Sequence, residues 1–196
     1  MIRSTLRTAG SGAFNPLVSV GVGGPSVLIR PDREFHELIT VDAIGHRDLR
    51  TQPTIKGPDL DWLADCLMQS RDRGADEGLL HDDAGFVIEA VYSTILVLGP
   101  GRATLIRHPR SLRSTTADGV CTLLRGSGWP VTEETRIRPR ELMRSQVWLL
   151  NAFSGVRAVT GWVTERGLIP APDAVEAGPN GMSGVSAQLW STAIRV

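Results

Sequence analysis

The feature that most constrains the fold is a series of short strand-like runs joined by tight turns in the middle of the chain. Apolar and β-branched runs follow one another at residues 78–81, 86–90, 93–98 and 103–108, with Asp-Asp-Ala-Gly and Gly-Pro-Gly turns among them. This spacing predicts antiparallel strands. Segments that predict helices are interspersed without a regular strand–helix alternation, so the sequence predicts an α+β fold.

The pattern extends in both directions along the chain. Further strands are expected at 5–8, 17–22, 26–30, 38–43, 131–137, 147–151 and 156–163. Helices are expected at about 60–73, 116–125, 139–144 and 185–194. In the first of these helices, Leu60, Leu63 and Leu67 recur on one face, and Gly74 ends it.

The charge balance and the cysteine usage exclude several classes of protein. The 21 basic and 21 acidic residues give a formal net charge of zero, so the chain lacks the long-range field on which a general nucleic-acid binder relies. No apolar run approaches roughly 18 residues, and the N-terminus makes a poor signal peptide. We expect a cytoplasmic protein that binds neither nucleic acid nor a membrane. Cys66 and Cys121 lie far apart in helical segments and read as small buried hydrophobes, and the histidines lack ligand spacing, so no metal site is predicted.

One lysine stands out among the basic residues, because 20 of the 21 are arginine and the remaining one is Lys56. Arginine serves where only positive charge matters, but it cannot replace lysine where a neutral amine must attack a carbonyl carbon. From composition alone, a leftover surface lysine is the simpler interpretation. However, Lys56 lies between Pro53 and Pro58, and Asp59 is a candidate N-cap for the next helix. A stiff turn at a strand-to-helix junction would hold this amine in place.

Several separated motifs resemble, in the same order, those of the class-IV aminotransferases, the pyridoxal-phosphate enzymes of fold type IV. Ile55-Lys56 resembles the Schiff-base lysine motif, and residues 83–89 resemble the hairpin that ends in the glutamate facing the cofactor ring nitrogen. Residues 112–116 lie where the family has its phosphate-binding turn. Asn151-Ala152 and the following Gly155-Val156-Arg157 are similar to segments of the lyase branch.

The resemblance implies a large domain of the D-amino-acid aminotransferase type, with antiparallel strands wrapped by helices, over residues 25–196. Residues 1–24 would be a remnant of the small N-terminal domain and a linker, because the glycine-rich segment 21–25 is the clearest linker in the chain. Most of the small domain would then be missing before Met1, and a homodimer is expected.

The resemblance also implies pyridoxal 5'-phosphate as the cofactor, with no metal. Lys56 would be the catalytic residue, at the floor of a cleft, with its side chain pointing toward Glu89 and Thr116. It would form the Schiff base and transfer the proton at the substrate's α-carbon. Glu89 would pair with the ring nitrogen, and the helix beginning near Thr116 would bind the phosphate through its free N–H groups. The cofactor-binding residues implied are Lys56, Glu89, Thr115, Thr116, Asn151 and Ala152.

Some residues depart from the family pattern. Arg113 and Ser114 replace the Pro-Gly of the phosphate turn, and the bulky Val91 and Tyr92 follow Glu89. Asp118, in the first turn of the helix, would repel a phosphate if its side chain turned inward.

The predicted function follows from the lyase-like segments, Asn151-Ala152 and Gly155-Val156-Arg157. They favour an enzyme similar to 4-amino-4-deoxychorismate lyase, which would release pyruvate from an amino compound. An aminotransferase acting on a small amino acid, as the branched-chain aminotransferases do, is the first alternative. The second is a truncated, non-catalytic domain that serves as a binding or dimer partner.

Overall fold

The computed structural model describes residues 2–8, 14–31 and 36–192, and their contacts divide them into two units. The first unit contains α1 (Ile2–Thr8), β1 (Phe14–Gly21) and β2 (Gly24–Pro31). The second contains β3 (Leu38–Arg47), α2 (Leu60–Asp72), β4 (Glu77–His81), β5 (Val87–Ala90), β6 (Thr94–Gly99), β7 (Arg102–Ile106), α3 (Thr115–Gly126), β8 (Val131–Glu134), α4 (Pro139–Leu142), β9 (Gln146–Asn151), β10 (Gly155–Thr164), β11 (Gly167–Pro170) and α5 (Gly181–Ser191).

The first unit differs from the sequence-based expectation at two places. β1 and β2 pair antiparallel with Gly21 opposite Gly24, so the glycine-rich segment predicted as a linker forms the tight turn of a hairpin. The contacts separate the two units after this hairpin, between residues 31 and 36, and not at residue 24. The strand predicted at residues 5–8 is wrong, because these residues belong to α1. There the Thr8 hydroxyl donates a hydrogen bond to the carbonyl of Ser4, one helical turn earlier.

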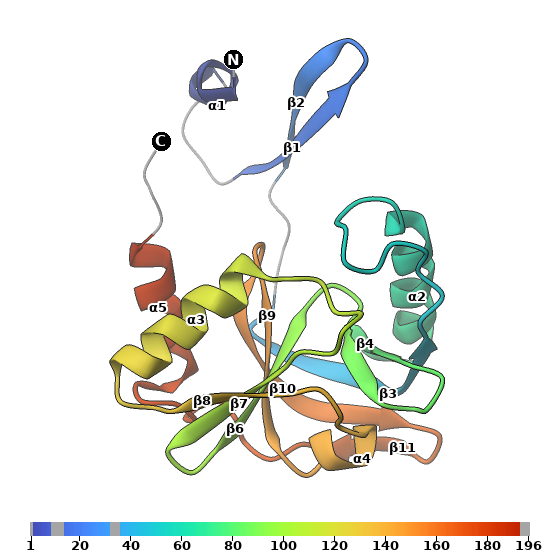
Figure 1. Ribbon diagram of the computed structural model, residues 1–196, viewed down its shortest axis with the longest axis vertical. Helices are drawn as coiled ribbons and strands as arrows, with labels where there is room; N and C mark the ends of the chain where they lie inside the picture. Colours follow the sequence, from blue (N-terminus) through green and yellow to red (C-terminus); the bar gives the residue numbers. More distant parts are fainter. Residues whose placement is uncertain (1, 9–13, 32–35, 193–196) are drawn as a thin grey trace. The chain divides into compact units, whose positions relative to one another are not determined.

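The second unit is built on one curled, mixed sheet (Figure 1). Within the described residues its strand order is β5-β4-β3-β10-β9-β6-β7-β8, and β11, which the sequence analysis missed, pairs with β10. The neighbouring pairs are antiparallel except β3–β10, β3–β4 and β7–β8. Two of these parallel pairs follow from the chain path, because α2 connects β3 to β4 and α3 connects β7 to β8. The α+β class is therefore confirmed.

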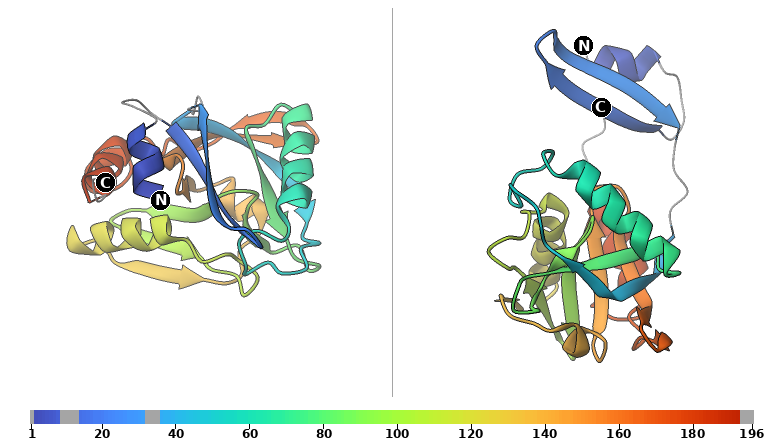
Figure 2. Two further views of the ribbon diagram at one scale, coloured as in Figure 1. Left: turned by 90° about the horizontal axis from the view of Figure 1, so that it is seen from above. Right: turned by 90° about the vertical axis from the view of Figure 1, so that its right-hand side faces the viewer.

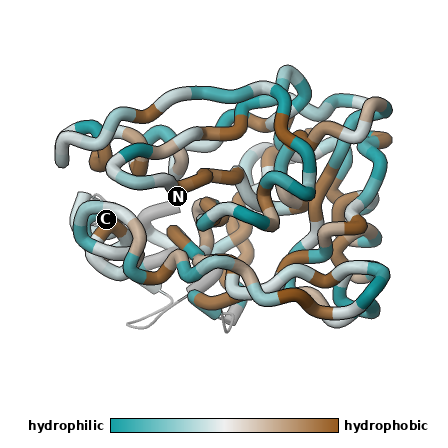
Figure 3. The backbone as a smooth tube through the Cα atoms, turned by 90° about the horizontal axis from the view of Figure 1, so that it is seen from below, coloured by the Kyte–Doolittle hydropathy of each residue, from teal (hydrophilic) through white to brown (hydrophobic). Residues whose placement is uncertain are grey.

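Both faces of this sheet are covered, as the alternation along β9 shows. Trp148 and Leu150 pack in the cluster that includes residues of α3 and α5, whereas Val147 and Leu149 pack in a second cluster on the other face. Figure 2 shows α2 on one flank of the unit and α3 with α5 on the opposite flank. Figure 3 shows short apolar stretches alternating with polar ones along the backbone. Among the described helices, none is long and apolar enough to cross a membrane.

The two cysteines lie in helices, as predicted, and both are free and buried. Cys66 belongs to a cluster in which α2 packs on β4 and β5, and Cys121 belongs to the cluster in which α3 packs on the sheet. Burial raises the pKa of the Cys66 thiol to about 11. Both therefore act as small apolar side chains.

A buried polar cluster fastens α2 to β3. The Ser70 hydroxyl donates to Asp42 at 3.0 Å and lies 2.8 Å from the His46 ring nitrogen Nε2. Arg73, at the end of α2, forms an ion pair with the same carboxylate. Burial lowers the pKa of His46 below its ordinary value of 6.5.

This lowered pKa predicts that the cluster loses stability in mild acid. Below about pH 6.5 the unfolded chain binds a proton at His46 more readily than the folded chain does, so the stabilisation is complete above that pH and is lost as pH falls. We expect the free energy of unfolding of the wild type, relative to a His46→Gln variant, to decrease from about pH 7.5 to about pH 5.5. Urea titrations of both proteins at several pH values measure this difference. A difference that does not change with pH would contradict the assignment.

Candidate active site

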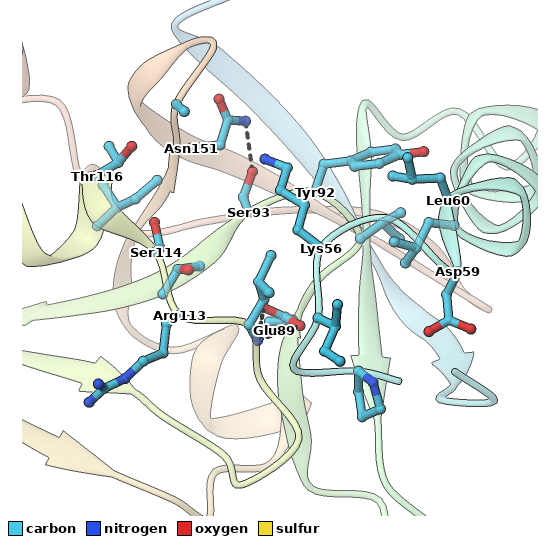
Figure 4. A pocket seen from close by; sticks show the side chains of 18 of the residues that line it. Lys56, Asp59, Leu60, Glu89, Tyr92, Ser93, Arg113, Ser114, Thr116 and Asn151 are labelled. Atoms are coloured by element: carbon cyan, nitrogen blue, oxygen red, sulfur yellow. Dashed lines mark hydrogen bonds between the residues drawn. The ribbon is translucent and has the colours of Figure 1, made fainter. Parts of the chain in front are cut away.

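One pocket of the second unit brings together four separate segments of the chain (Figure 4). They are the loop between β3 and α2, the end of β5 with the turn after it, the segment leading into α3, and the end of β9. The pocket has a volume of about 240 Å³. Its lining includes all of the residues named from the sequence, namely Lys56, Glu89, Thr115, Thr116, Asn151 and Ala152.

The loop that carries Lys56 is closed by a carboxylate. Asp59 accepts hydrogen bonds from the backbone N–H and the hydroxyl of Thr51, both at 3.0 Å, and from the N–H of Gln52 at 3.0 Å. These bonds lower the pKa of Asp59. The side chain makes no capping hydrogen bond to α2, so Asp59 pins the two ends of the loop together instead of capping the helix through its carboxylate. Gly57, with φ of +133°, supplies the left-handed turn directly after the lysine.

Lys56 itself is exposed, so the expectation that it lies at the floor of a cleft is wrong. In Figure 4 its side chain points toward Ser93 and Asn151, and not toward Glu89. It makes no hydrogen bond or ion pair with any residue that the structure describes, so nothing fixes the long side chain in one direction. The loop therefore places Lys56 at the pocket wall, and its side chain is free to move there.

Glu89 is the buried acid of the pocket, with 5% of its surface exposed. Arg50 Nη1 donates to its Oε1 at 2.6 Å, and the Leu112 N–H donates to both carboxylate oxygens at 3.1 and 3.2 Å. Burial raises the pKa of Glu89 to about 7, against the opposing effect of the Arg50 cation and these hydrogen bonds. A carboxyl group with that pKa can accept or donate a proton near neutral pH.

A second carboxylate beneath Glu89 joins two of the pocket segments. Asp48 accepts hydrogen bonds from Arg50 Nε and from Arg110 Nε, both at 2.8 Å. Arg110 Nη2 also donates to the Arg50 carbonyl at 2.9 Å, and Arg50 Nη2 donates to the Arg110 carbonyl at 3.2 Å. Although burial raises the pKa of Asp48, the hydrogen bonds from Arg50 and Arg110 bring it below its usual range. The network ties the lysine loop to the segment before α3.

The N-terminus of α3 opens on the pocket. Ser114 is the N-cap, and its side chain accepts a hydrogen bond from the Ala117 N–H at 3.2 Å. The N–H groups of Thr115 and Thr116 precede the first intrahelical bonds, and among the described residues no acceptor binds them. Asp118, which could have repelled an anion here, instead pairs with Arg107 at 3.1 Å, and its side chain is 62% exposed. The helix end therefore presents free donors without a facing acid.

The wall beside Lys56 is a hydrogen-bonded cluster around Ser93. The Ser93 hydroxyl oxygen accepts hydrogen bonds from Arg157 Nη2 at 2.8 Å and from the Asn151 side-chain amide at 3.0 Å. The same hydroxyl donates to Glu77 at 3.3 Å, and Arg157 pairs with Glu77 at 2.8 Å. With both acceptor positions and its proton committed, the Ser93 hydroxyl is a fixed support of the pocket and not a proton carrier.

Val91 and Tyr92, noted as bulky in the sequence, both line the pocket. Val91 is 4% exposed and packs under α2, whereas Tyr92 is 39% exposed at the rim. Val91 therefore adds an apolar side chain to a wall that Ser93 and Asn151 otherwise make polar.

Three residues that shape the site were not found from the sequence: Arg50, Ser93 and Glu77. Arg50 is one of 20 arginines, and its partners lie 39 residues away at Glu89 and 60 residues away at the Arg110 carbonyl. No local pattern marks such a pair. Arg157 was noticed within a motif, but its contact with Glu77 spans 80 residues.

The comparisons with known proteins support the resemblance. The model of the family described as amino-transferase class IV matches residues 2–162. No curated protein matches the chain.

Solved structures match over nearly the whole chain. A branched-chain amino acid aminotransferase from T.th. has a TM-score of 0.73 and 18% identity, covering 97% of this chain and 67% of its own. A hypothetical aminotransferase from Mycobacterium tuberculosis, in a PLP-bound form, has a TM-score of 0.68 and 18% identity, covering 98% and 72%. A candidate 4-amino-4-deoxychorismate lyase has a TM-score of 0.64 and 23% identity, covering 86% and 63%. At these identities the similarity shows a shared fold, and the chain spans only about two thirds of the length of the structures it matches.

Proposed function

Because the chain belongs to the amino-transferase class IV family, we propose that its pocket binds pyridoxal phosphate and that the protein is a lyase of the aminodeoxychorismate lyase type. The observation that supports this most strongly is the convergence of four chain segments, with an amine, a buried carboxyl group and a free helix N-terminus, on one pocket. Each of these groups was named from the sequence for a different part of the cofactor.

The donor set of the pocket fits this cofactor. Pyridoxal phosphate has an aldehyde, a ring nitrogen that is basic, and a phosphate dianion. The pocket offers the Lys56 amine, the Glu89 carboxyl group and the free N–H groups at the start of α3. The Thr116 hydroxyl, on a side chain that is only 8% exposed, has no hydrogen-bond partner among the described residues and is a further donor there.

Lys56 would hold the aldehyde carbon through its amine and, once displaced by the substrate amine, would carry the proton at the substrate's α-carbon. When bound, pyridoxal phosphate supplies a ring that withdraws the electron pair left on that carbon. The loop closed by Asp59 keeps the Lys56 backbone at the pocket wall, and in Figure 4 the side chain points toward the cluster formed by Ser93 and Asn151. No other lysine exists in the chain to take this role.

Glu89 would bind the ring nitrogen. Arg50 and the Leu112 N–H orient its carboxyl group, and its raised pKa allows the proton between acid and ring to be shared near neutral pH. Buried Val91 also lines the pocket. At the opposite end, the N–H groups of Thr115 and Thr116 would bind the phosphate with the favourable end of the helix dipole.

The choice of lyase chemistry is supported by the segment from Asn151 to Arg157. Both of these residues donate to the Ser93 hydroxyl, so the lyase-like motif supports the wall beside the lysine. An aminotransferase is the second candidate, because structures named as branched-chain amino acid aminotransferases share the fold.

Two assays on the protein mixed with pyridoxal phosphate separate these candidates. The first offers aminodeoxychorismate alone and measures pyruvate, and the second offers an amino acid with a keto acid and measures the exchanged products. We expect pyruvate release without any keto acid. Exchange without pyruvate release would instead assign an aminotransferase. Absence of both activities, together with absence of visible absorption from bound cofactor, would contradict an enzymatic role.

A further inference from the structure

Arg113 is an unpaired cation at the pocket. Other arginines near the site are neutralised by carboxylates, namely Arg50, Arg107, Arg110 and Arg157. Arg113 lines the pocket and is exposed, and among the residues that the structure describes it has no carboxylate and no hydrogen-bond acceptor. Its charge is therefore available to a ligand.

Arg113 lies next to the N-terminus of α3. It directly precedes Ser114, the N-cap of α3, and so stands next to the free N–H groups of Thr115 and Thr116. The Thr116 side chain is more than nine-tenths buried, yet its hydroxyl lacks a partner within the described part of the chain and faces the pocket. Because this hydroxyl is not among the buried unpartnered atoms of the described residues, it is open to the pocket and can donate to a ligand there.

The charges around this point favour an anion. Asp118 in the first turn of α3 is turned outward to Arg107. Glu89 is held by Arg50 and by the Leu112 N–H. The segment from Arg113 to Thr116 thus combines a guanidinium, free amides, a hydroxyl and the positive end of a helix of 12 residues.

We propose that Arg113 is a ligand of a phosphate monoester bound at the start of α3. The planar guanidinium can donate two parallel hydrogen bonds to phosphate oxygens, a geometry that a single ammonium cannot reproduce. In Figure 4 the side chain of Arg113 extends away from Lys56, and because no contact restrains it, the side chain can turn toward the helix end when the anion binds. This assignment rests on the proposed function for the identity of the ester as pyridoxal phosphate.

The experiment measures three dissociation constants: for pyridoxal phosphate, for pyridoxal, which lacks the phosphate, and for inorganic phosphate. The first two come from the absorbance of the bound compound, and the third from equilibrium dialysis of phosphate with the protein alone. The variants are Arg113→Gln and Arg113→Lys. Arg102→Gln is the matched control, because it removes the same charge from an exposed position on β7 outside the pocket lining.

We expect Arg113→Gln to weaken pyridoxal phosphate and inorganic phosphate by roughly tenfold, as the loss of a charge-assisted hydrogen bond implies, and to leave pyridoxal unchanged. Arg113→Lys should restore part of the loss, and Arg102→Gln should change nothing. Unchanged phosphate binding in Arg113→Gln would overturn the assignment. So would equal weakening of pyridoxal, or equal weakening in the control.

The two ligand classes also separate this proposal from the proposed function. If the wild type binds neither pyridoxal phosphate nor pyridoxal at Lys56, the proposed function fails, whereas the effect of Arg113 on inorganic phosphate still decides the role of this residue. If pyridoxal phosphate attaches equally well in wild type and in Arg113→Gln, the role of Arg113 fails and the proposed function stands.

Discussion

Replacing Lys56 by arginine should abolish covalent binding of pyridoxal phosphate and lower cofactor-dependent turnover by roughly a thousandfold or more. Arginine keeps the positive charge but stays protonated and cannot attack the aldehyde. The fold should be unaffected, because Lys56 is exposed and has no partner within the described residues. Visible absorption of the bound cofactor and steady-state rates measure the loss, and urea unfolding should change by no more than about 0.5 kcal/mol.

A double variant supplies the matched control for position. Lys56→Arg combined with Arg102→Lys keeps one lysine in the chain but moves it to β7, outside the pocket lining. We expect this protein to be as inactive as Lys56→Arg. Recovery of cofactor binding or turnover in the double variant would show that any exposed amine suffices and that the pocket is not the active site.

Replacing Arg50 by methionine should lower the free energy of unfolding by about 3–5 kcal/mol. Its side chain is 5% exposed and lies between the buried carboxylates of Asp48 and Glu89. Among the described residues Glu89 would lose its one ion pair, whereas Asp48 would keep its pair with Arg110. The control is Arg110→Met, because within the described residues Arg110 forms an ion pair with Asp48 alone, and its side chain is 39% exposed. Its removal should therefore lower the free energy of unfolding by less. Urea unfolding at neutral pH measures the free energies of unfolding of the wild type, Arg50→Met and Arg110→Met, and Arg50→Met should be the least stable.

The Arg50 variant should also respond to pH in a defined direction. Burial raises the pKa of Glu89 to about 7, and Arg50 opposes that rise, so removing Arg50 raises it further. When the pKa of a carboxyl group is higher in the folded than in the unfolded protein, the free energy of unfolding decreases as pH rises from the unfolded pKa to the folded pKa. The free energy of unfolding that Arg50→Met loses relative to the wild type should therefore become smaller as pH is lowered from about 7.5 to about 5. If this loss became larger in acid, Glu89 would not be the group that Arg50→Met leaves without its cation.

The strands of the second unit could be predicted because their apolar residues alternate. In β9, for example, successive residues face opposite clusters, and the pattern is visible in the sequence itself. α1 could not be predicted in this way, because a seven-residue segment shows too little periodicity and its helix is supported by a hydrogen bond of the Thr8 hydroxyl. The hairpin turn at Gly21–Gly24 was misread as a linker, because glycines serve both structures.

The pocket residues could be named from short motifs, whereas the contacts that hold them could not. Lys56 and Glu89 stand in local patterns, but the Arg50 side chain that orients Glu89 depends on β4 and β5 folding back toward the β3–α2 loop. The contacts of Asp59 could not be predicted from a local motif either. It was recognised at the start of a helix, yet its carboxylate binds Thr51 and Gln52 and so holds the lysine loop.

The most direct test of the central claim is where the cofactor attaches when it is scarce. The protein is mixed with less than one equivalent of pyridoxal phosphate and reduced with borohydride, and its peptides are examined by mass spectrometry. Because Lys56 is the only lysine, the competing amine is the N-terminus, and the same chain unfolded in urea is the reference. We predict that cofactor mass accumulates on the Lys56 peptide in the folded protein and that this preference over the N-terminus disappears in urea. An equal preference in folded and unfolded chains would mean that Lys56 is an ordinary lysine and that the pocket does not bind the cofactor.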